Sequence, residues 1–84
     1  MKGTIYDINP KRGMVAVQTD NGDFSIFEII SANQVEIGQE VSWSGNTPTG
    51  SAMITNHGSG ERFEVYFQNH WVSRHQLDQQ LLRR

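Results

Sequence analysis

Several features on which small proteins often depend are missing from this chain. None of its 84 residues is cysteine, so neither a disulfide framework nor a cysteine-based zinc site can support the fold. No apolar run approaches the roughly 20 residues of a membrane-spanning helix, and the residues after Met1 lack the apolar core of a signal peptide. We therefore expect a soluble, cytoplasmic protein that uses no membrane and no cofactor.

Basic residues are scarce as well. Seven Lys and Arg against nine Asp and Glu give a formal net charge of −2, whereas a general polyanion binder normally carries a basic stripe. A chain this short forms one domain and buries only about 60% of its extended surface on folding. Its core must therefore be small and well packed.

The clearest element is a β-hairpin over residues 14–30. Asn21-Gly22 is the preferred pair for a type I′ turn, in which both central residues have positive φ. A two-residue loop there pairs Val17 with Ile26, and alternation divides the hairpin into a face that lines a barrel interior and a face that lies outside. The interior face carries Val15, Val17, Phe24 and Ile26. The outer face carries Met14, Ala16, Gln18, Ser25, Phe27 and Ile29.

Three more strands are predicted around the hairpin. They cover Thr4–Ile8, Glu40–Trp43 and Ser51–Thr55. A turn over residues 45–50, which contains Pro48, joins the last two. The strands predict a mainly β fold with a small five-stranded antiparallel barrel over residues 2–55. Its buried residues should include Val15, Val17, Ile26 and Val41.

The same part of the chain carries a recognisable pattern of turn and glycine residues. Gly3 opens the first strand, and Asn9-Pro10 ends it. Lys11-Arg12-Gly13 leads into the second strand, and Gly38-Gln39-Glu40-Val41-Ser42-Trp43 opens the fourth. This pattern resembles the cold-shock domain, a five-stranded OB-fold barrel, over about residues 2–55. The resemblance implies binding of single-stranded RNA or DNA on the outer face of the first three strands.

Most of the side chains that the family uses to contact bases are replaced here. Those positions are occupied by Asp7, Ile8, Met14, Ala16, Ser25, Phe27 and Glu28. Because each stacked base contributes about 1–3 kcal/mol, we expect weak, low-specificity binding, with a dissociation constant in the micromolar range or above. The residues left to contact bases and phosphates are Tyr6, Lys11, Arg12, Met14, Phe27 and Lys2. The alternative is that Tyr6 packs at the barrel edge and that the basic turn is simply solvated.

Residues 59–84 extend beyond the resemblance, and we separate them from the barrel at 1–58 as an added segment of one domain. Residues 62–72 alternate, which predicts a half-buried strand. Its buried side should carry Phe63, Val65, Phe67 and Trp71. The segment should pack on the barrel or on a partner, because these side chains are too apolar to remain in water.

A helix of about ten residues should follow this strand. Ser73 and Gln76 have the spacing of a capping box, which places the N-terminus of the helix at Ser73. Arg83 and Arg84 suit the negative end of the helix dipole. The apolar stripe of the helix consists of Leu77, Leu81 and Leu82.

Two functions remain open. The first is a cold-shock-like module that binds single-stranded RNA or DNA weakly. The second is a protein-interaction or assembly module, with the nucleic-acid face lost, that binds a protein partner or a second copy of itself. Its interface would be Phe63, Phe67, Trp71, Leu77 and Leu81. The structure can discriminate between them, since Met14 and Phe27 lie either open beside basic side chains or beneath residues 62–82.

No motif for catalysis is present. The histidines are His57, His70 and His75, and no cysteine accompanies them. A metal shared by His70 and His75 would need a carboxylate such as Asp78 as a further ligand. We therefore expect neither a metal site nor an enzyme.

Overall fold

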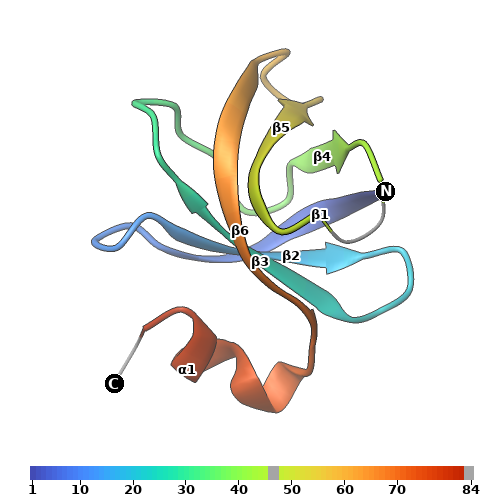
Figure 1. The fold of residues 1–84 in the computed structure, drawn as a ribbon, viewed down its shortest axis with the longest axis vertical. Helices are drawn as coiled ribbons and strands as arrows, with labels where there is room; N and C mark the ends of the chain where they lie inside the picture. The colour runs from blue at the N-terminus through green and yellow to red at the C-terminus, as the bar shows by residue number, and fades with distance from the viewer. Residues whose placement is uncertain (46–47, 83–84) are drawn as a thin grey trace.

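The computed structural model describes residues 1–45 and 48–82 of the chain. It contains six strands, a 3₁₀ turn and one short α-helix (Figure 1). The strands are β1 (Lys2–Asn9), β2 (Met14–Thr19), β3 (Phe24–Ile29), β4 (Glu40–Trp43), β5 (Gly50–Asn56) and β6 (Arg62–Val72). The helical segment consists of η1 (Arg74–Gln76) and α1 (Leu77–Gln80). The mainly β class, with a barrel and a short C-terminal helix, is confirmed.

The strands form one closed barrel in the order β1-β2-β3-β6-β5-β4, and every neighbouring pair is antiparallel. Strand direction can alternate around a closed ring only if the number of strands is even. The added strand β6 supplies the sixth member, between β3 and β5, and the barrel therefore does not close with five strands. The division at residue 58 consequently falls inside the barrel.

The hairpin between β2 and β3 has a longer loop than expected. Gly22 donates its N–H to the carbonyl of Thr19 at 3.0 Å, and Thr19 donates its N–H to the carbonyl of Asp23 at 2.9 Å. Gly22 has a φ of +90°, whereas Asn21 does not have positive φ. The loop is thus a type I turn followed by a left-handed glycine, and the type I′ prediction was wrong.

This single extra residue changes the faces of β3. Val17 pairs with Ser25 instead of Ile26, and a shift of one residue moves every side chain of a strand to the other face. Phe27 therefore points into the barrel, while Phe24 and Ile26 point outward. Ile26 is buried as expected, but outside the barrel.

Two apolar clusters result. The interior cluster fills the barrel and consists of Ile5, Val15, Val17, Phe27, Val35, Val41, Trp43, Ile54, Phe63, Val65 and Phe67. The outer cluster lies between the barrel wall and the C-terminal helix and consists of Met14, Ala16, Phe24, Ile26, Val72, Leu77 and Leu81. Figure 1 shows α1 on the β2 and β3 side of the barrel, away from β4 and β5.

Strand β6 contributes to both clusters, and its alternation breaks near its end. Phe63, Val65 and Phe67 point inward as predicted, but Trp71 is 71% exposed and Val72 is buried instead. Trp71 has a φ of +54°, and the register between β3 and β6 shifts on both sides of Ile26. Val72 belongs to the outer cluster, and the expectation that Trp71 is buried was wrong.

The helical segment begins where the sequence predicts. The backbone N–H of Ser73 donates to Oε1 of Gln76 at 3.2 Å, which is one arm of the predicted capping box. Leu77 and Leu81 face inward as expected, but Leu82 is exposed. The side-chain amide of Asn9 donates to the carbonyl of Leu81 at 2.7 Å and ties the end of this segment to β1.

Two of the expectations involve residues that the structure does not describe. Arg83 and Arg84, at the expected C-terminal end of the helix, lie beyond the described residues. The turn over 45–50 is described at its two ends, where Gly45 and Gly50 both have positive φ, but not at residues 46–47. Within the described residues, no helix is long and apolar enough to cross a membrane.

Candidate nucleic-acid interface

The face on which the resemblance places the bases is covered by the chain itself. Met14 is only 5% exposed and belongs to the outer cluster beneath Leu77 and Leu81. Phe27 is fully buried in the barrel interior, on the other side of the wall. Neither side chain can contact a base in this structure.

The residues of the alternative interface are also mostly used within the chain. Phe63, Phe67, Leu77 and Leu81 are all buried in one of the two clusters. Only Trp71 remains open to a partner. The aromatic load of the C-terminal segment is thus explained mainly by barrel closure.

Of the aromatic residues predicted to contact bases, Tyr6 remains at the surface. It lies at a register shift of β1, between Ile5 and Asp7, and is 37% exposed. Its ring meets the edge of Phe24 with centroids 4.8 Å apart. The guanidinium carbon of Arg74 lies 5.7 Å from the centroid of the Tyr6 ring, within the range of a cation–π contact. Tyr6 therefore packs at the edge of the outer cluster, with the guanidinium of Arg74 over its ring.

Trp71 is an exposed aromatic residue close in sequence to Arg74. Phe24, whose ring touches Tyr6, pairs with Val72, the residue after Trp71. Arg74 follows Trp71 by three residues at the start of the helical segment. We call Tyr6, Trp71 and Arg74 the aromatic–arginine surface.

Sequence reasoning missed Arg74, although a signal was present. An arginine in the first turn of a helix opposes the helix dipole, which favours acidic side chains at that end. The helix dipole therefore does not account for an arginine at the start of this segment. In the structure, its contact is with the Tyr6 ring.

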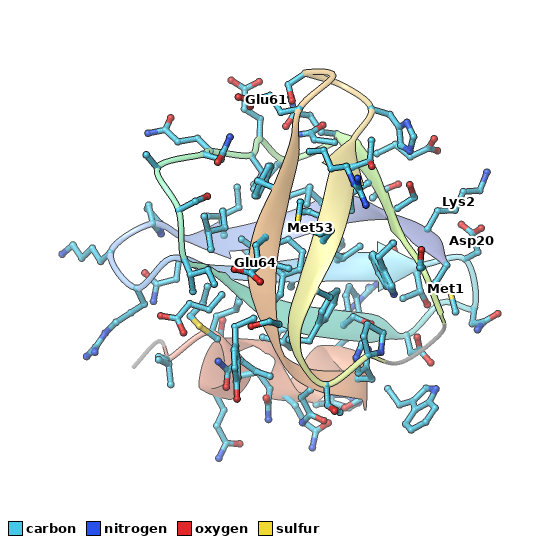
Figure 2. All side chains as sticks on the ribbon, turned by 45° about the horizontal axis from the view of Figure 1, so that its top comes forward. Met1, Lys2, Asp20, Met53, Glu61 and Glu64 are labelled. Atoms are coloured by element: carbon cyan, nitrogen blue, oxygen red, sulfur yellow. The ribbon has the colours of Figure 1, made fainter. Side chains whose placement is uncertain are left out.

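The other predicted basic residues are not brought together. Lys2 begins β1, while Lys11 and Arg12 lie in the turn after its end. Eight residues of strand place these groups roughly 25 Å apart. Lys2 also lies near Asp20 (Figure 2), as expected from the pairing of Gly3 with Thr19. The chain thus has no continuous basic stripe among the described residues.

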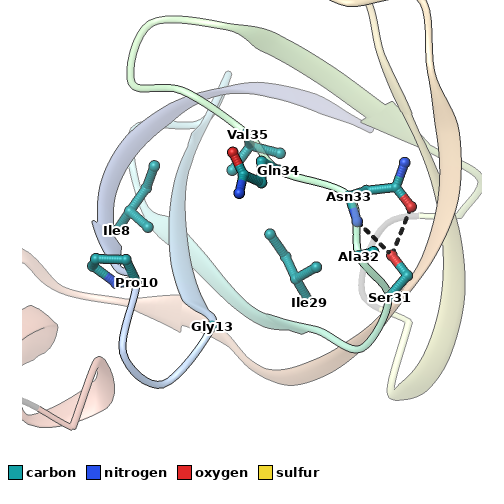
Figure 3. Close-up of a pocket in the computed structure, with 9 residues that line it drawn as sticks. All are labelled: Ile8, Pro10, Gly13, Ile29, Ser31, Ala32, Asn33, Gln34 and Val35. Atoms are coloured by element: carbon teal, nitrogen blue, oxygen red, sulfur yellow. Dashed lines mark hydrogen bonds between the residues drawn. The ribbon is translucent and has the colours of Figure 1, made fainter.

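A pocket of about 640 Å³ opens at one end of the barrel (Figure 3). It forms because β4 is short. The pairing of β4 with β1 covers only residues 2–4 of β1. Residues 31–35 therefore border this end of the barrel as a loop. The pocket is lined by aliphatic side chains below and by hydroxyl and amide groups on one side. These residues are Ile8, Ile29, Ala32 and Val35, and Ser31, Asn33 and Gln34, together with Pro10 and Gly13.

The histidines are separate from one another, and His57 and His70 take part in local contacts. His57 Nε2 lies 2.8 Å from the hydroxyl of Ser42. The ring of His70 bridges the hydroxyl of Ser25 at 2.8 Å and the carbonyl of Pro48 at 2.5 Å. His75 is exposed in η1. Among the described residues, no group of three or more His, Cys, Asp or Glu side chains is placed to hold a metal ion.

Comparison with known proteins adds no relative. No protein-family model, no curated protein and no solved structure matches this chain.

Proposed function

We propose that this protein is a cold-shock-like binding module that binds single-stranded RNA or DNA weakly and with low sequence specificity. The binding site is the aromatic–arginine surface, in place of the covered outer face of β1–β3. The observations that support the proposal are the guanidinium of Arg74 at 5.7 Å from the ring of Tyr6 and the exposed ring of Trp71, three residues before Arg74 in the chain. We further propose that the protein is cytoplasmic and that it has no catalytic activity.

The physical argument is base stacking with limited electrostatic support. An open indole ring can stack on any base, and the planar guanidinium of Arg74 can stack on a base or contact a phosphate. One or two stacked bases contribute about 1–3 kcal/mol each. A net charge of −2 adds no general attraction for a polyanion. The expected dissociation constant is therefore micromolar or weaker.

The test is a fluorescence titration with a short oligonucleotide, such as a 12-mer of deoxythymidine, at two salt concentrations. Trp43 is only 6% exposed, so quenching reports mainly on Trp71. The change Trp71→Ala removes the reporter as well as the platform, so its binding is measured by anisotropy of a labelled strand. We expect about tenfold weaker binding, from the loss of one stacked base. Tyr66→Ala, at an exposed aromatic residue elsewhere on β6, is the matched control and should leave binding unchanged.

A matched pair of substitutions tests the contribution of the Arg74 charge to binding. Arg74→Gln should weaken binding and reduce the salt slope by about one, whereas Arg62→Gln, at the other end of β6, should do neither. Nanomolar binding at physiological salt would show that a different, larger surface is used. If no oligonucleotide quenches Trp71 or binds in the anisotropy assay, the nucleic-acid proposal is wrong.

The exposure of Trp71 also favours a second candidate, self-association or binding of a protein partner. A large indole that is 71% exposed is unusual on a monomer surface and is frequent at the centre of interfaces. Mass measurement in solution at two protein concentrations tests self-association. A dimer that Trp71→Ala abolishes, together with a lack of oligonucleotide binding, would replace the first proposal by this one.

A further inference from the structure

A polar groove lies between the turn that joins β1 to β2 and the end of the helical segment. Its volume of about 540 Å³ lies within the range of about 300–1,000 Å³ that is usual for small-ligand sites. Most of its lining side chains are charged or carry an amide group. They are Arg12, Glu28, Gln68, Gln79 and Gln80, together with Met14 and Leu82. No residue of the aromatic–arginine surface is among them, so the groove is a separate candidate site.

The groove is built by elements that the fold holds together. Glu28 lies near the end of β3, where it pairs with Met14 of β2 and with Tyr66 of β6. The bond from the side chain of Asn9 to the carbonyl of Leu81 fixes the end of the helical segment beside the end of β1. Figure 1 shows the turn after β1 and the end of this segment on the same side of the molecule. The wall that carries Arg12 and the wall that the helix supplies are thus joined by a hydrogen bond.

Two side chains of opposite charge line the groove. Arg12 is exposed and Glu28 is half-buried, and among the described residues neither forms an ion pair. Glu28 accepts a hydrogen bond from Nε2 of Gln68 at 3.4 Å, which is long for such a bond. A carboxylate can accept about four hydrogen bonds, so Glu28 keeps acceptor capacity for a ligand. The groove therefore presents a cation and an anion that do not neutralise each other.

We propose that this groove binds a free α-amino acid in its zwitterionic form, with a long uncharged side chain. The α-carboxylate accepts from the guanidinium of Arg12, whose fork of N–H donors suits a carboxylate. The α-ammonium donates to the carboxylate of Glu28. The side chain of the ligand extends along the amides of Gln79 and Gln80. This inference goes beyond the proposed strand binding and does not rest on it.

The charges of the groove select this occupant. A purely anionic ligand, such as a nucleotide, would be repelled by Glu28, and a purely cationic ligand would be repelled by Arg12. A peptide carries its ammonium and its carboxylate at opposite ends, so it cannot present both to the groove at one position. The remaining lining groups are amides and aliphatic chains without charge. They match an uncharged side chain, and the volume leaves room for a long one.

The experiment follows the methionine methyl resonances of the full-length protein by nuclear magnetic resonance during titration with L-glutamine. Met14 lines the groove, whereas Met53 is exposed on β5 and serves as the internal control. We expect a saturable shift of the Met14 methyl alone, with a dissociation constant in the millimolar range, because exposed ion pairs contribute little. Glycine carries the same two charges without the side chain and should bind several-fold more weakly.

Two analogues of glutamine test the two charges on the unaltered protein. N-Acetyl-L-glutamine lacks the ammonium, and the α-amide of L-glutamine lacks the carboxylate. Each should bind about two- to fivefold more weakly than glutamine, from the loss of one ion pair. Because no substitution is involved, this comparison is independent of any effect on folding.

Matched variants then assign each charge to its side chain. Arg12→Gln should remove the preference for glutamine over its α-amide, and Glu28→Gln should remove the preference over the N-acetyl form. Lys11→Gln makes the same charge change beside Arg12 at a side chain that does not line the groove. Glu64→Gln, at an exposed position of β6, is the control for Glu28 (Figure 2). Both controls should keep both preferences.

The inference is wrong if glutamine at tens of millimolar produces no saturable shift of the Met14 methyl. It is also wrong if both analogues bind as well as glutamine, or if neither Arg12→Gln nor Glu28→Gln changes a preference. It is supported if each variant removes only its own preference and Trp71→Ala leaves glutamine binding unchanged. Since Trp71→Ala weakens only the proposed strand binding, failure of this inference and failure of that proposal are distinguishable.

Discussion

The interior cluster and the outer cluster are assembled in different ways. All six strands contribute to the interior cluster, so each of its side chains is held by neighbours from several directions. The outer cluster draws on β2 and β3 for its base and on Val72, Leu77 and Leu81 for its cover. One cluster is enclosed by the barrel, and the other exists only because the end of the chain lies over it.

The difference shows what the C-terminal segment does. Its first half, Phe63 to Phe67, completes the barrel, and its second half, Val72 to Leu81, covers the barrel wall. The helical segment has only seven residues from Arg74 to Gln80, too few to be stable alone in water. Its order depends on docking. We therefore expect the outer cluster to open locally before the interior cluster does.

Removal of residues 61–84 should have the largest effect. It deletes the strand between β3 and β5 and removes Phe63, Val65 and Phe67 from the interior cluster. Burial of these three side chains contributes on the order of 5–9 kcal/mol, which is comparable to the whole stability of a small domain. The fragment 1–60 should be unfolded by circular dichroism and prone to aggregate. Cooperative thermal unfolding of this fragment would show that the barrel closes without β6.

A pair of single substitutions compares the clusters directly. Phe67→Ala in the interior cluster should lower the free energy of unfolding by about 3–5 kcal/mol. Leu81→Ala in the outer cluster should cost about 2–3 kcal/mol, at the low end for a buried leucine, because the helical segment can relax around the gap. Urea denaturation measures both. An equal or larger cost for Leu81→Ala would mean that the helix is as firmly fixed as the barrel.

His70 lies where β6 passes from one cluster to the other, and its removal should have a smaller effect. Its ring stacks on Phe67 with centroids 5.0 Å apart and holds the hydroxyl of Ser25, a residue that is 2% exposed. His70→Ala should cost about 1–3 kcal/mol, because it leaves that buried hydroxyl without its partner. Thermal unfolding measures the change. His75→Ala, at an exposed position in η1, is the control and should be nearly neutral.

Substitutions in the turn between β2 and β3, which sets the inner and outer faces of β3, should have the smallest effect on stability. Gly22→Ala should cost about 1 kcal/mol, because Gly22 has a φ of +90°. Asn21→Ala should change the stability by less than about 0.5 kcal/mol, since Asn21 does not have positive φ. Chemical denaturation of both variants measures this contrast. Equal costs at the two positions would favour the two-residue turn and the opposite assignment of Phe24 and Phe27.

Much of the fold could be predicted from local patterns. The bounds of Glu40–Trp43 and of Arg62–Val72 agree with the structure, and the helical segment begins after Ser73 as predicted. These features depend on alternation and capping, which act between residues close in sequence. The register of β3 could not be read this way, because the Asn-Gly pair is compatible with more than one loop length. Thr19 is the residue that favours the longer loop, through its hydroxyl, which donates to Oδ1 of Asp23 at 2.6 Å.

The candidate site was predicted only in part, for the same reason. Tyr6 remains at the surface, but a shift of one residue in β3 moved Phe27 from the expected binding face into the barrel. Trp71 was expected inside because it continues the alternation of Phe63 and Phe67. In the structure Trp71 has a φ of +54°, and the register between β3 and β6 shifts between Asn69 and Val72, which local alternation does not predict.

The sequence by itself determined which segments are strands, where the helix begins and that the C-terminal segment cannot remain in water. Only the tertiary structure decided that β6 closes the barrel, which wall of the barrel the helix covers and which aromatic residues stay open. The physical reason is that alternation and capping are local, whereas closure of the barrel and competition for buried space involve residues far apart in the chain. A single residue in the loop between Thr19 and Asp23 was enough to exchange the inside and the outside of β3.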